Sequence, residues 1–393
     1  MNERLLDKDV QDFLDQNLDQ DLDRLIFRGS PFPDLSIREL AEQIESKRKC
    51  KTKLPTWFGT PGIIFPPKIS IEQASSEPTA RYKASLISGK RLADLSGGFG
   101  VDAYFFGLNF ERVTYVEVKE ELLLAARHNF DVLGADNISC FHGDGIAYLR
   151  DSNSFFDWIY LDPARRDAKK ERVFMLEDCS PNILDNLDVL LSKADGILLK
   201  LSPLLDITRT VMQLKEVTEI HVVALENEVK ELLFLIRKET QKMPVIHAVN
   251  IKNSGMDLFS AELNGSQSDP NYGPVDKYLY EPNAAILKAG LFNPVANEFN
   301  LTKVHPNSHL YSSEELIDFP GRRFVVVEQL KYNPKKIKKE LGLTRANVTT
   351  RNFHESVASI RKRTGLREGG DDYLFFTTDH KGRALVLLCS KAD

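Results

Sequence analysis

Residues 94–100 read Asp-Leu-Ser-Gly-Gly-Phe-Gly and follow an apolar-leaning run, so an acid at the end of a predicted strand leads into a glycine-rich turn. Glycine carries no Cβ, and the backbone of such a turn can approach a ligand closely. In a doubly wound α/β domain, this arrangement holds an adenosine-type cofactor at the carboxyl ends of the strands. A tight structural turn would explain the glycines equally well. The cofactor-binding candidates in this turn are Asp94, Ser96, Gly98 and Gly100.

Acids also follow the next three predicted strands. Glu117 lies about 20 residues beyond the glycine turn, where a carboxylate can accept hydrogen bonds from ribose hydroxyls. Asp144, after the predicted strand 138–142, can accept a hydrogen bond from the adenine amine, and Asp162 follows the strand 158–161. Each acid alone could equally lie in a surface turn or cap a helix. As an ordered set, the acids favour S-adenosylmethionine as the cofactor.

The tetrad Asp-Pro-Ala-Arg at residues 162–165 indicates what accepts the methyl group. Proline fixes φ and removes a backbone donor, so neighbouring carbonyls can face a ligand. A carboxylate and a carbonyl together can accept two hydrogen bonds from an exocyclic amine. Because the reaction is an in-line displacement, such positioning supplies most of the catalysis. Arg165 could stack on a base, bind a phosphate, or pair with Asp167 or Glu171. The catalytic candidates are Asp162, Pro163 and Arg165.

Covalent methylation of a carbon atom would require a cysteine just after the predicted strand 196–201. That position reads Lys-Leu-Ser-Pro without a thiol, and Cys179 is predicted to lie in a helix, where it packs rather than reacts. This chemistry is therefore disfavoured. Lys200 and Ser202 are candidates for lining the substrate side of the pocket.

A further helix is predicted to open at residues 75–80 and to end just before the first strand. A helix in this position often closes over the methionine end of the cofactor. We therefore expect Thr79 or Lys83 to contact the cofactor carboxylate. Simple capping of the helix is the alternative.

Strand-like and helical patterns alternate between residues 90 and 240, which predicts a mostly parallel sheet covered on both faces. The last two strands are joined by residues 225–231, too few for a crossover helix, so they should pair antiparallel. An antiparallel final strand is a hallmark of class I methyltransferases rather than dehydrogenases. The predicted strands are 91–95, 112–116, 138–142, 158–161, 196–201, 219–224 and 232–237, and the clearest helix covers 120–133.

Helical patterns dominate residues 1–85, with a capped helix beginning at Ser36. Beyond the sheet, residues 264–274 are predicted to be a linker, because they are rich in Gly, Ser, Asp and Pro. The remaining predicted elements are a hairpin of 245–251 and 256–263, strands at 323–328 and 384–388, and helices at 334–341 and 353–364.

The composition, with 393 residues, 42% hydrophobic and 28% charged, is that of an ordinary globular protein of two or three domains. No apolar run is long enough to span a bilayer, and the N-terminus lacks an apolar signal core. The four cysteines are scattered, which argues against a zinc site and fits a reducing cytoplasm. We expect a cytoplasmic protein without a metal or a membrane partner.

Charge is unevenly distributed along a chain whose net charge is −5. Residues 7–23 carry seven aspartates and one lysine. Residues 321–370 carry thirteen basic and four acidic side chains, a net charge of about +9. A basic end on an acidic protein suggests an anionic partner, although a solvated, lysine-rich helix face is an equally good explanation.

Taken together, these motifs resemble the bacterial class I S-adenosylmethionine-dependent methyltransferases that carry a C-terminal THUMP-like domain. The resemblance covers nearly the whole chain. It departs from the broad class at Ser96, where many members have glycine, and in the Asp-Pro-Ala-Arg tetrad. The matching segments are residues 53–57, 73–80, 94–102, 162–166, 199–203, 280–283, 319–322, 351–353 and 373–375.

This resemblance implies a Rossmann-like, seven-stranded α/β methyltransferase domain with small α+β domains after it. The implied boundaries are a helical region at 1–88, the catalytic domain at 89–275, a ferredoxin-like domain at 276–328 and the THUMP-like domain at 329–393. THUMP domains belong to RNA-modifying enzymes, so the implied substrate is RNA, with tRNA as the expected class, held by the basic end.

The leading hypothesis is an S-adenosylmethionine-dependent RNA methyltransferase that acts on a base amine. One alternative is a non-catalytic RNA-binding module with a relict cofactor pocket. Another is a methyltransferase acting on a protein or a small molecule, for which the basic end would have no obvious task.

Overall fold

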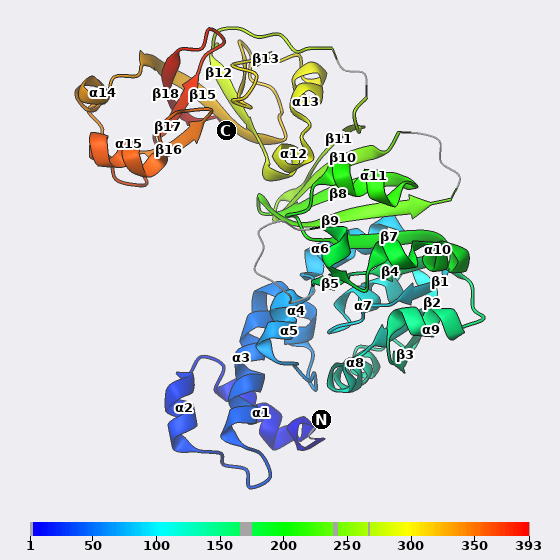
Figure 1. The fold of residues 1–393 in the computed structure, drawn as a ribbon. Helices are drawn as coiled ribbons and strands as arrows, with labels where there is room; N and C mark the ends of the chain where they lie inside the picture. Colours follow the sequence, from blue (N-terminus) through cyan, green and yellow to red (C-terminus); the bar gives the residue numbers. More distant parts are fainter. Residues whose placement is uncertain (1–2, 166–174, 239–242, 266–267, 393) are drawn as a thin grey trace. The chain divides into compact units, whose positions relative to one another are not determined.

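The computed structural model describes residues 3–165, 175–238, 243–265 and 268–392 and is drawn in Figure 1. The chain forms two compact units. The first comprises Met1–Glu219 and Glu231–Lys242, and the second comprises Ile220–Lys230 and Met243–Asp393. None of the helices in the described ranges combines the length and the apolar character that crossing a bilayer requires.

Helices open the first unit, as predicted. The helix α3 (Ile37–Lys53) begins at the expected cap: the Ser36 hydroxyl accepts the backbone N–H of Glu39, and the Glu39 carboxylate accepts the N–H of Ser36. Leucines at helical spacing bury an apolar face between α1, α2 and α3. The other helices here are α1 (Lys8–Gln16), α2 (Leu22–Arg28), α4 (Pro55–Gly59), α5 (Lys68–Gln73) and α6 (Glu77–Leu86).

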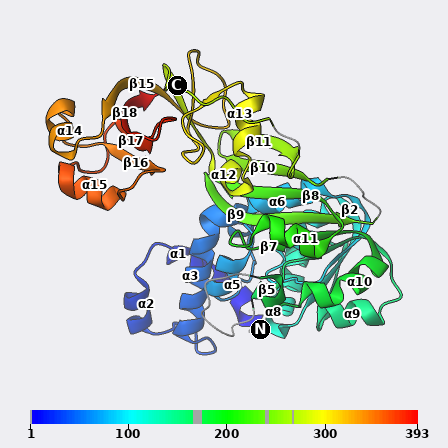
Figure 2. The same cartoon turned by 45° about the horizontal axis from the view of Figure 1, so that its top comes forward.

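The strands of the first unit run in the order β9-β7-β4-β1-β2-β3, and Figure 2 shows the ribbon turned from the view of Figure 1. All neighbouring strands are parallel except β9, which runs antiparallel to β7. The predicted reversal of the last strand is therefore confirmed. The strands are β1 (Gly89–Asp94), β2 (Phe110–Glu117), β3 (Ile138–His142), β4 (Phe156–Leu161), β7 (Ala194–Leu201) and β9 (Glu228–Arg237).

Helices alternate with these strands along the chain, as predicted. Because each helix carries the chain back to the start of the next strand, the carboxyl ends of the parallel strands all lie at one edge of the sheet. The helix α8 packs on β2 and β3, and α10 packs on β7. The helices are α7 (Val101–Gly107), α8 (Glu120–Val132), α9 (Gly145–Asp151), α10 (Ile183–Lys193) and α11 (Ile207–Leu214).

The strand β8 (Val217–Leu225) precedes β9 and starts beside its end, where the N–H of Arg237 donates to the Glu216 carbonyl over 3.2 Å. Their connection is shorter than predicted. Only Glu226 and Asn227 form the turn, and both have left-handed φ values, 49° and 65°. Such two-residue turns match the twist of antiparallel strands.

The second unit contains the predicted hairpin, β10 (Val245–Lys252) and β11 (Gly255–Glu262), and a seven-stranded sheet in the order β13-β14-β12-β15-β18-β17-β16. The predicted helix at 353–364 begins later, at Val357, because Ser356 caps it. The other elements are β12 (Tyr278–Pro282), β13 (Thr302–Lys303), β14 (Tyr311–Ser313), β15 (Gly321–Lys331), β16 (Asn347–Arg351), β17 (Tyr373–Thr378), β18 (Ala384–Lys391), α12 (Ala284–Ala289), α13 (Phe292–Glu298), α14 (Pro334–Leu341) and α15 (Val357–Thr364).

Candidate active site

The glycine turn after β1 forms a concave cradle. Larger residues would either clash with neighbouring side chains or fill the open space. A Cβ on Gly97 would lie 2.3 Å from the Tyr115 ring, and one on Gly100 would lie 2.6 Å from the Phe130 ring. Gly98 differs: its φ is 57° and the nearest atom to an added Cβ is 3.8 Å away. Packing therefore requires two of the glycines, while Gly98 leaves open space above the turn, as close approach of a ligand demands.

Asp94 is buried, with 1% of its surface exposed, at the end of β1. Its Oδ1 accepts the backbone N–H of Ser96 over 3.0 Å. Its Oδ2 is also buried and has no hydrogen-bond partner among the described residues. Burial raises the pKa of Asp94 to about 8, helped by the charges of Asp102 and Asp162 and opposed by the Ser96 hydrogen bonds. A buried acceptor without a partner at this turn fits a ligand that brings a hydrogen-bond donor.

Glu117 links the end of β2 to the same turn. Its Oε2 accepts the N–H of Gly98 over 2.7 Å, and its Oε1 accepts the N–H of Lys119 over 2.8 Å. A carboxylate oxygen has two lone pairs, so each retains one acceptor position. The structure thus brings Glu117 to the turn, and its predicted contact with a ribose stays a prediction.

Asp144 caps α9, where its Oδ1 accepts the N–H of Ala147 over 2.8 Å. The next residue shows how this helix meets the glycine turn: a Cβ on Gly145 would lie 2.4 Å from the Leu95 carbonyl oxygen. Only glycine allows that approach, and it sets Asp144 near the turn. Capping and the predicted contact with adenine are compatible, because one Oδ of the exposed carboxylate makes the cap.

Asp162 is tied to the glycine turn through Ser96. The backbone N–H of Asp162 donates to the Ser96 hydroxyl oxygen over 2.7 Å, and that hydroxyl lies 3.3 Å from Asp94 Oδ1, to which it donates. The Asp162 carboxylate forms an ion pair with Lys200 at the end of β7. Burial lowers the pKa of Lys200, but the charges of Asp162, Asp102 and Glu231 outweigh it and raise the pKa above its ordinary value.

The rest of the tetrad leads into a short ladder. Pro163 is half-buried, and β5 (Ala164–Arg165) pairs with β6 (Cys179–Ser180), which sets Arg165 opposite Cys179. The helix predicted around Cys179 is therefore wrong: this residue opens a strand, where the ladder satisfies its backbone. Arg166, Asp167 and Glu171, named in the sequence-based alternatives, lie outside the described residues. The predicted roles of Pro163 and Arg165 stay predictions.

Lys83 of α6 is fully buried in an ion-pair network. Its Nζ lies 2.8 and 2.9 Å from the two carboxylate oxygens of Glu231, 3.0 Å from the Ser75 hydroxyl and 3.3 Å from Asp102 Oδ1. These partners occupy the ammonium. Thr79, also buried, donates to the Ser76 carbonyl over 3.0 Å. The arrangement gives both residues a structural task, and their predicted contact with a cofactor carboxylate stays a prediction.

Asp102 and Glu231 complete this network, and sequence reasoning assigned no role to either. Asp102 Oδ2 accepts the hydroxyls of Ser75 and Tyr160, both over 2.8 Å. Burial raises the pKa of Asp102, but Lys83 and Lys200 outweigh it and lower the pKa. For Glu231, burial outweighs the two lysines and raises the pKa. An acid in the apolar run of β9 was the one signal in the sequence.

Several basic side chains of the second unit are committed to ion pairs. Buried Glu281 binds both Arg322 and Arg351, and further pairs join Arg323 to Asp318, Arg361 to Glu368, and Arg363 to Glu355. The net charge of this region therefore overstates the number of basic side chains that an anionic partner could contact. Exposed cations include Lys331, Arg345, Lys362 and Arg367, and the backbones of Arg345 and Arg367 form a β-bridge.

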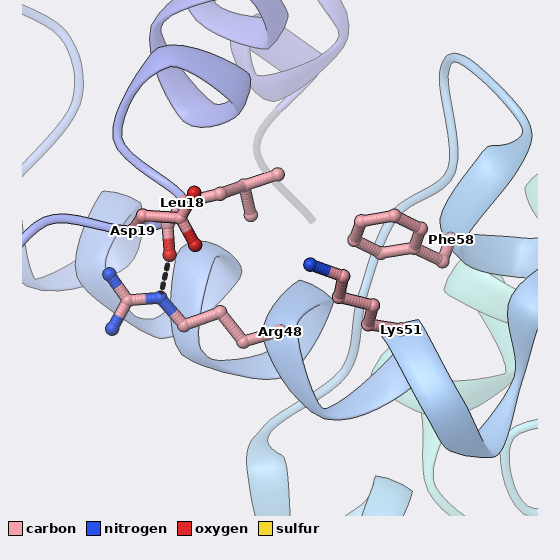
Figure 3. A pocket seen from close by; sticks show the side chains of 5 residues that line it. All are labelled: Leu18, Asp19, Arg48, Lys51 and Phe58. Carbon is pink, nitrogen blue, oxygen red and sulfur yellow. Dashed lines mark hydrogen bonds between the residues drawn. The ribbon is translucent and has the colours of Figure 1, made fainter.

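A cavity of about 400 Å³ lies in the N-terminal helices, lined by Leu18, Asp19, Arg48, Lys51 and Phe58 (Figure 3). The Arg48 guanidinium donates to the carbonyls of Asn17, Leu18 and Gln20. Arg48 thus satisfies the carbonyls that follow α1, and the residues of the glycine turn are not among those that line this cavity.

Comparisons with known proteins match both units. The chain matches the ferredoxin-like domain family over residues 278–320 and the THUMP domain-like family over residues 321–391. It is 34% identical to the solved structure of a proposed methyltransferase from Porphyromonas gingivalis. That likeness has a TM-score of 0.91 and covers 100% of this chain and 99% of the other.

Two curated relatives are more distant. An uncharacterized S-adenosylmethionine-dependent methyltransferase of Mycobacterium tuberculosis is 24% identical over 303 residues, which are 76% of this chain and 80% of that protein. An uncharacterized RNA methyltransferase of Mycoplasma mobile is 26% identical over 150 residues, 37% of this chain and 41% of that protein.

Proposed function

This chain belongs to the class I S-adenosylmethionine-dependent methyltransferases that carry a C-terminal THUMP-like domain, and from that premise we propose that it methylates RNA. Its enzyme class and its cofactor follow from the family. The THUMP domain-like match at residues 321–391 is the observation that carries the choice of substrate. The Mycoplasma mobile relative, named as an RNA methyltransferase, supports the same choice.

The residues of the glycine turn fit the cofactor, which supplies an activated methyl group on a sulfonium. In our proposal, the unpartnered Oδ2 of Asp94 accepts a hydrogen bond from the amino end of the cofactor. Glu117 accepts from the ribose and Asp144 from the adenine amine. The open space at Gly98 admits the cofactor to the backbone.

The tetrad forms the acceptor side. Asp162 and a carbonyl beside Pro163 are the predicted hydrogen-bond acceptors for a base amine, and Arg165 would bind the base or a phosphate. Since Ser96 holds the Asp162 amide, the cofactor turn and the acceptor residues keep a fixed spacing. Fixed spacing is what an in-line displacement needs.

RNA would be held through its phosphates by the exposed cations of the second unit. Arg345 and Arg367 lie on bridged backbone positions and are the best-placed candidates. Binding of this kind weakens steeply with salt, because each contact releases counterions. We propose tRNA as the first RNA class to test.

The test is transfer of labelled methyl from S-adenosylmethionine to tRNA, rRNA and protein fractions from cells that lack this enzyme. We expect label in RNA, and label only in protein would refute the proposal. A relict RNA-binding module would instead bind RNA without binding the cofactor. Calorimetry with S-adenosylmethionine separates that case. An intact cofactor site gives a heat of binding with the wild type, and this heat is lost in Asp144→Ala, whereas a relict module gives none with either protein.

A further inference from the structure

Two lysines, Lys83 fully buried and Lys200 largely so, lie among acids at the carboxyl edge of the first unit's sheet. Lys200 pairs with Asp162, the acid of the tetrad. Lys83 pairs with Glu231 and lies 3.3 Å from Asp102. The two pairs form one cluster, because the charges of Asp102 and Glu231 also act on Lys200.

The fold alone does not account for this cluster. Taking ions out of water is expensive, and replacing a buried ion pair by apolar residues is often neutral or stabilising. The exposures point the same way: the side chain of Lys200 is 13% exposed and that of Asp162 is 35% exposed. The Asp162 carboxylate is therefore the more accessible group of the pair on the acceptor side, and the Lys200 ammonium lies deeper.

An ammonium at this place discriminates between acceptor atoms. An amine nitrogen gains positive charge as the methyl group arrives, and a neighbouring ammonium opposes that change. A hydroxyl oxygen instead gains negative charge as its proton leaves, and an ammonium stabilises it. An amine acceptor needs only the carboxylate and the carbonyl, so it leaves Lys200 without a chemical task.

We infer that the acceptor is a ribose 2′-hydroxyl of RNA, contacted by Asp162 and Lys200, with Lys83 and Glu231 as positioning residues. The 2′-hydroxyl is the hydroxyl that distinguishes RNA from DNA and that RNA-binding proteins contact. The inference rests on the proposed function for its RNA substrate, and it replaces the base amine predicted from the tetrad.

The methyl transfer balances with Asp162, Lys200 and the family's cofactor. The ribose O–H bond breaks and its proton passes to the Asp162 carboxylate, while Lys200 donates a hydrogen bond to the same oxygen. The new O–CH₃ bond forms as the S–CH₃ bond breaks, and that electron pair stays on sulfur. Asp162 then loses the proton to solvent. An ammonium has three donors, so Lys200 can hold Asp162 and the oxygen together.

Product identity tests the inference directly on the wild-type enzyme. RNA carrying labelled methyl is hydrolysed in alkali, and a second portion is digested to nucleosides for mass spectrometry. A 2′-O-methyl group blocks alkaline cleavage at its own linkage, so we expect alkali-stable labelled dinucleotides and ribose-methylated nucleosides. Label only in base-methylated nucleosides would overturn this inference and leave the proposed function standing. RNA without any label would overturn both.

Variants test the assigned residues by a second readout. Lys200→Met keeps a long side chain without charge, and Asp162→Asn keeps the shape of the acid. We expect each to lower kcat by about 100-fold or more, with S-adenosylmethionine affinity in calorimetry unchanged within a few-fold. Lys193→Met, at the end of α10, is the matched control. Wild-type kcat in both variants would contradict the assignment, and so would loss of cofactor affinity in Lys200→Met.

Discussion

The backbone amide of Asp162 donates a hydrogen bond to the Ser96 hydroxyl over 2.7 Å, which joins the end of β4 to the turn after β1. The same hydroxyl donates to Asp94. Ser96 is thus more than a small residue that fits the glycine turn. It connects the acid of the cofactor turn with the acid of the acceptor tetrad.

Removing this connection should weaken both stability and turnover. Ser96→Ala loses two hydrogen bonds at a half-buried site, and we expect the free energy of unfolding to fall by about 1–2 kcal/mol. Urea denaturation measures the loss, and kcat should fall with it because Asp162 is less well positioned. Ser85→Ala, which removes an exposed hydroxyl at the end of α6, is the control. Equal stability of the two variants would count against the tether.

The pH dependence of stability should reveal the buried acid of the turn. Because burial raises the pKa of Asp94 to about 8, the ligand-free fold keeps a proton that the unfolded chain releases above about pH 4. The contribution of Asp94 therefore becomes destabilising as pH rises through this window, and levels off above about pH 8.

Asp94→Asn should lack this contribution. We expect the stability of the wild type, relative to that of the variant, to fall between about pH 5 and about pH 8 in denaturant titrations. Taking the difference between the two proteins cancels the titration of other groups. A difference that does not change with pH would mean that Asp94 is ionised in the fold.

Two glycines with similar backbones separate cofactor binding from backbone strain. Gly98 and Gly134 have φ values of 57° and 69°, and an added Cβ would meet no atom closer than 3.8 Å at either. Alanine at each should cost a similar free energy of unfolding, about 1 kcal/mol. Only Gly98→Ala should also lower the affinity for S-adenosylmethionine in calorimetry, since its methyl group enters the cradle. Equal affinities would place the cofactor elsewhere.

The network around Lys83 should be strongly coupled. Lys83→Met leaves Glu231 buried without its partner, and the expected loss is about 3–5 kcal/mol of unfolding free energy. Glu231→Gln should restore part of that loss in the double variant, because it removes the unpaired charge. A double-mutant cycle in urea measures the coupling. Additive losses would show that the pair is not coupled, and lost cofactor affinity in the stable double variant would support the predicted cofactor role of Lys83.

RNA binding should depend on the exposed arginines of the second unit. Replacing Arg345 and Arg367 by glutamine should weaken binding to tRNA at low salt and reduce the slope of log affinity against log salt by about 2. Arg383→Gln, whose side chain is paired with Asp379, is the matched control. Filter binding over a salt series gives both quantities, and an unchanged slope would exclude these two residues as phosphate contacts.

Much of the fold was accessible from the sequence because local patterns dominate it. The strand 138–142 was predicted with its observed bounds, and β1, β2 and β4 within two residues, since turn residues and apolar runs mark them. The strands β16 and β17 were not predicted. Tyr373–Thr378 is apolar enough to read as a strand, but Asn347–Arg351 is mostly polar, and its partner decides its structure.

Only part of the candidate site could be predicted from the sequence, because some of its contacts join residues that are far apart in the chain. Acids at strand ends can be read from local order, whereas the Lys83–Glu231 pair joins residues 148 positions apart. Neither residue signals the other in a single sequence. Ser96 was conspicuous only as a departure, and its partner, the Asp162 amide, belongs to the backbone, which no residue type reveals.

The short ladder of β5 and β6 offers a native handle for spectroscopy. None of the four cysteines forms a disulfide. Burial raises the pKa of Cys50 and of Cys389 to about 12, so both remain unreactive thiols. Cys179, half-buried, stands opposite Arg165. Burial also raises the pKa of the half-buried Cys140. In a Cys140→Ser variant, a fluorophore attached to Cys179 by thiol chemistry would sit beside the tetrad and report the arrival of RNA by a change in emission.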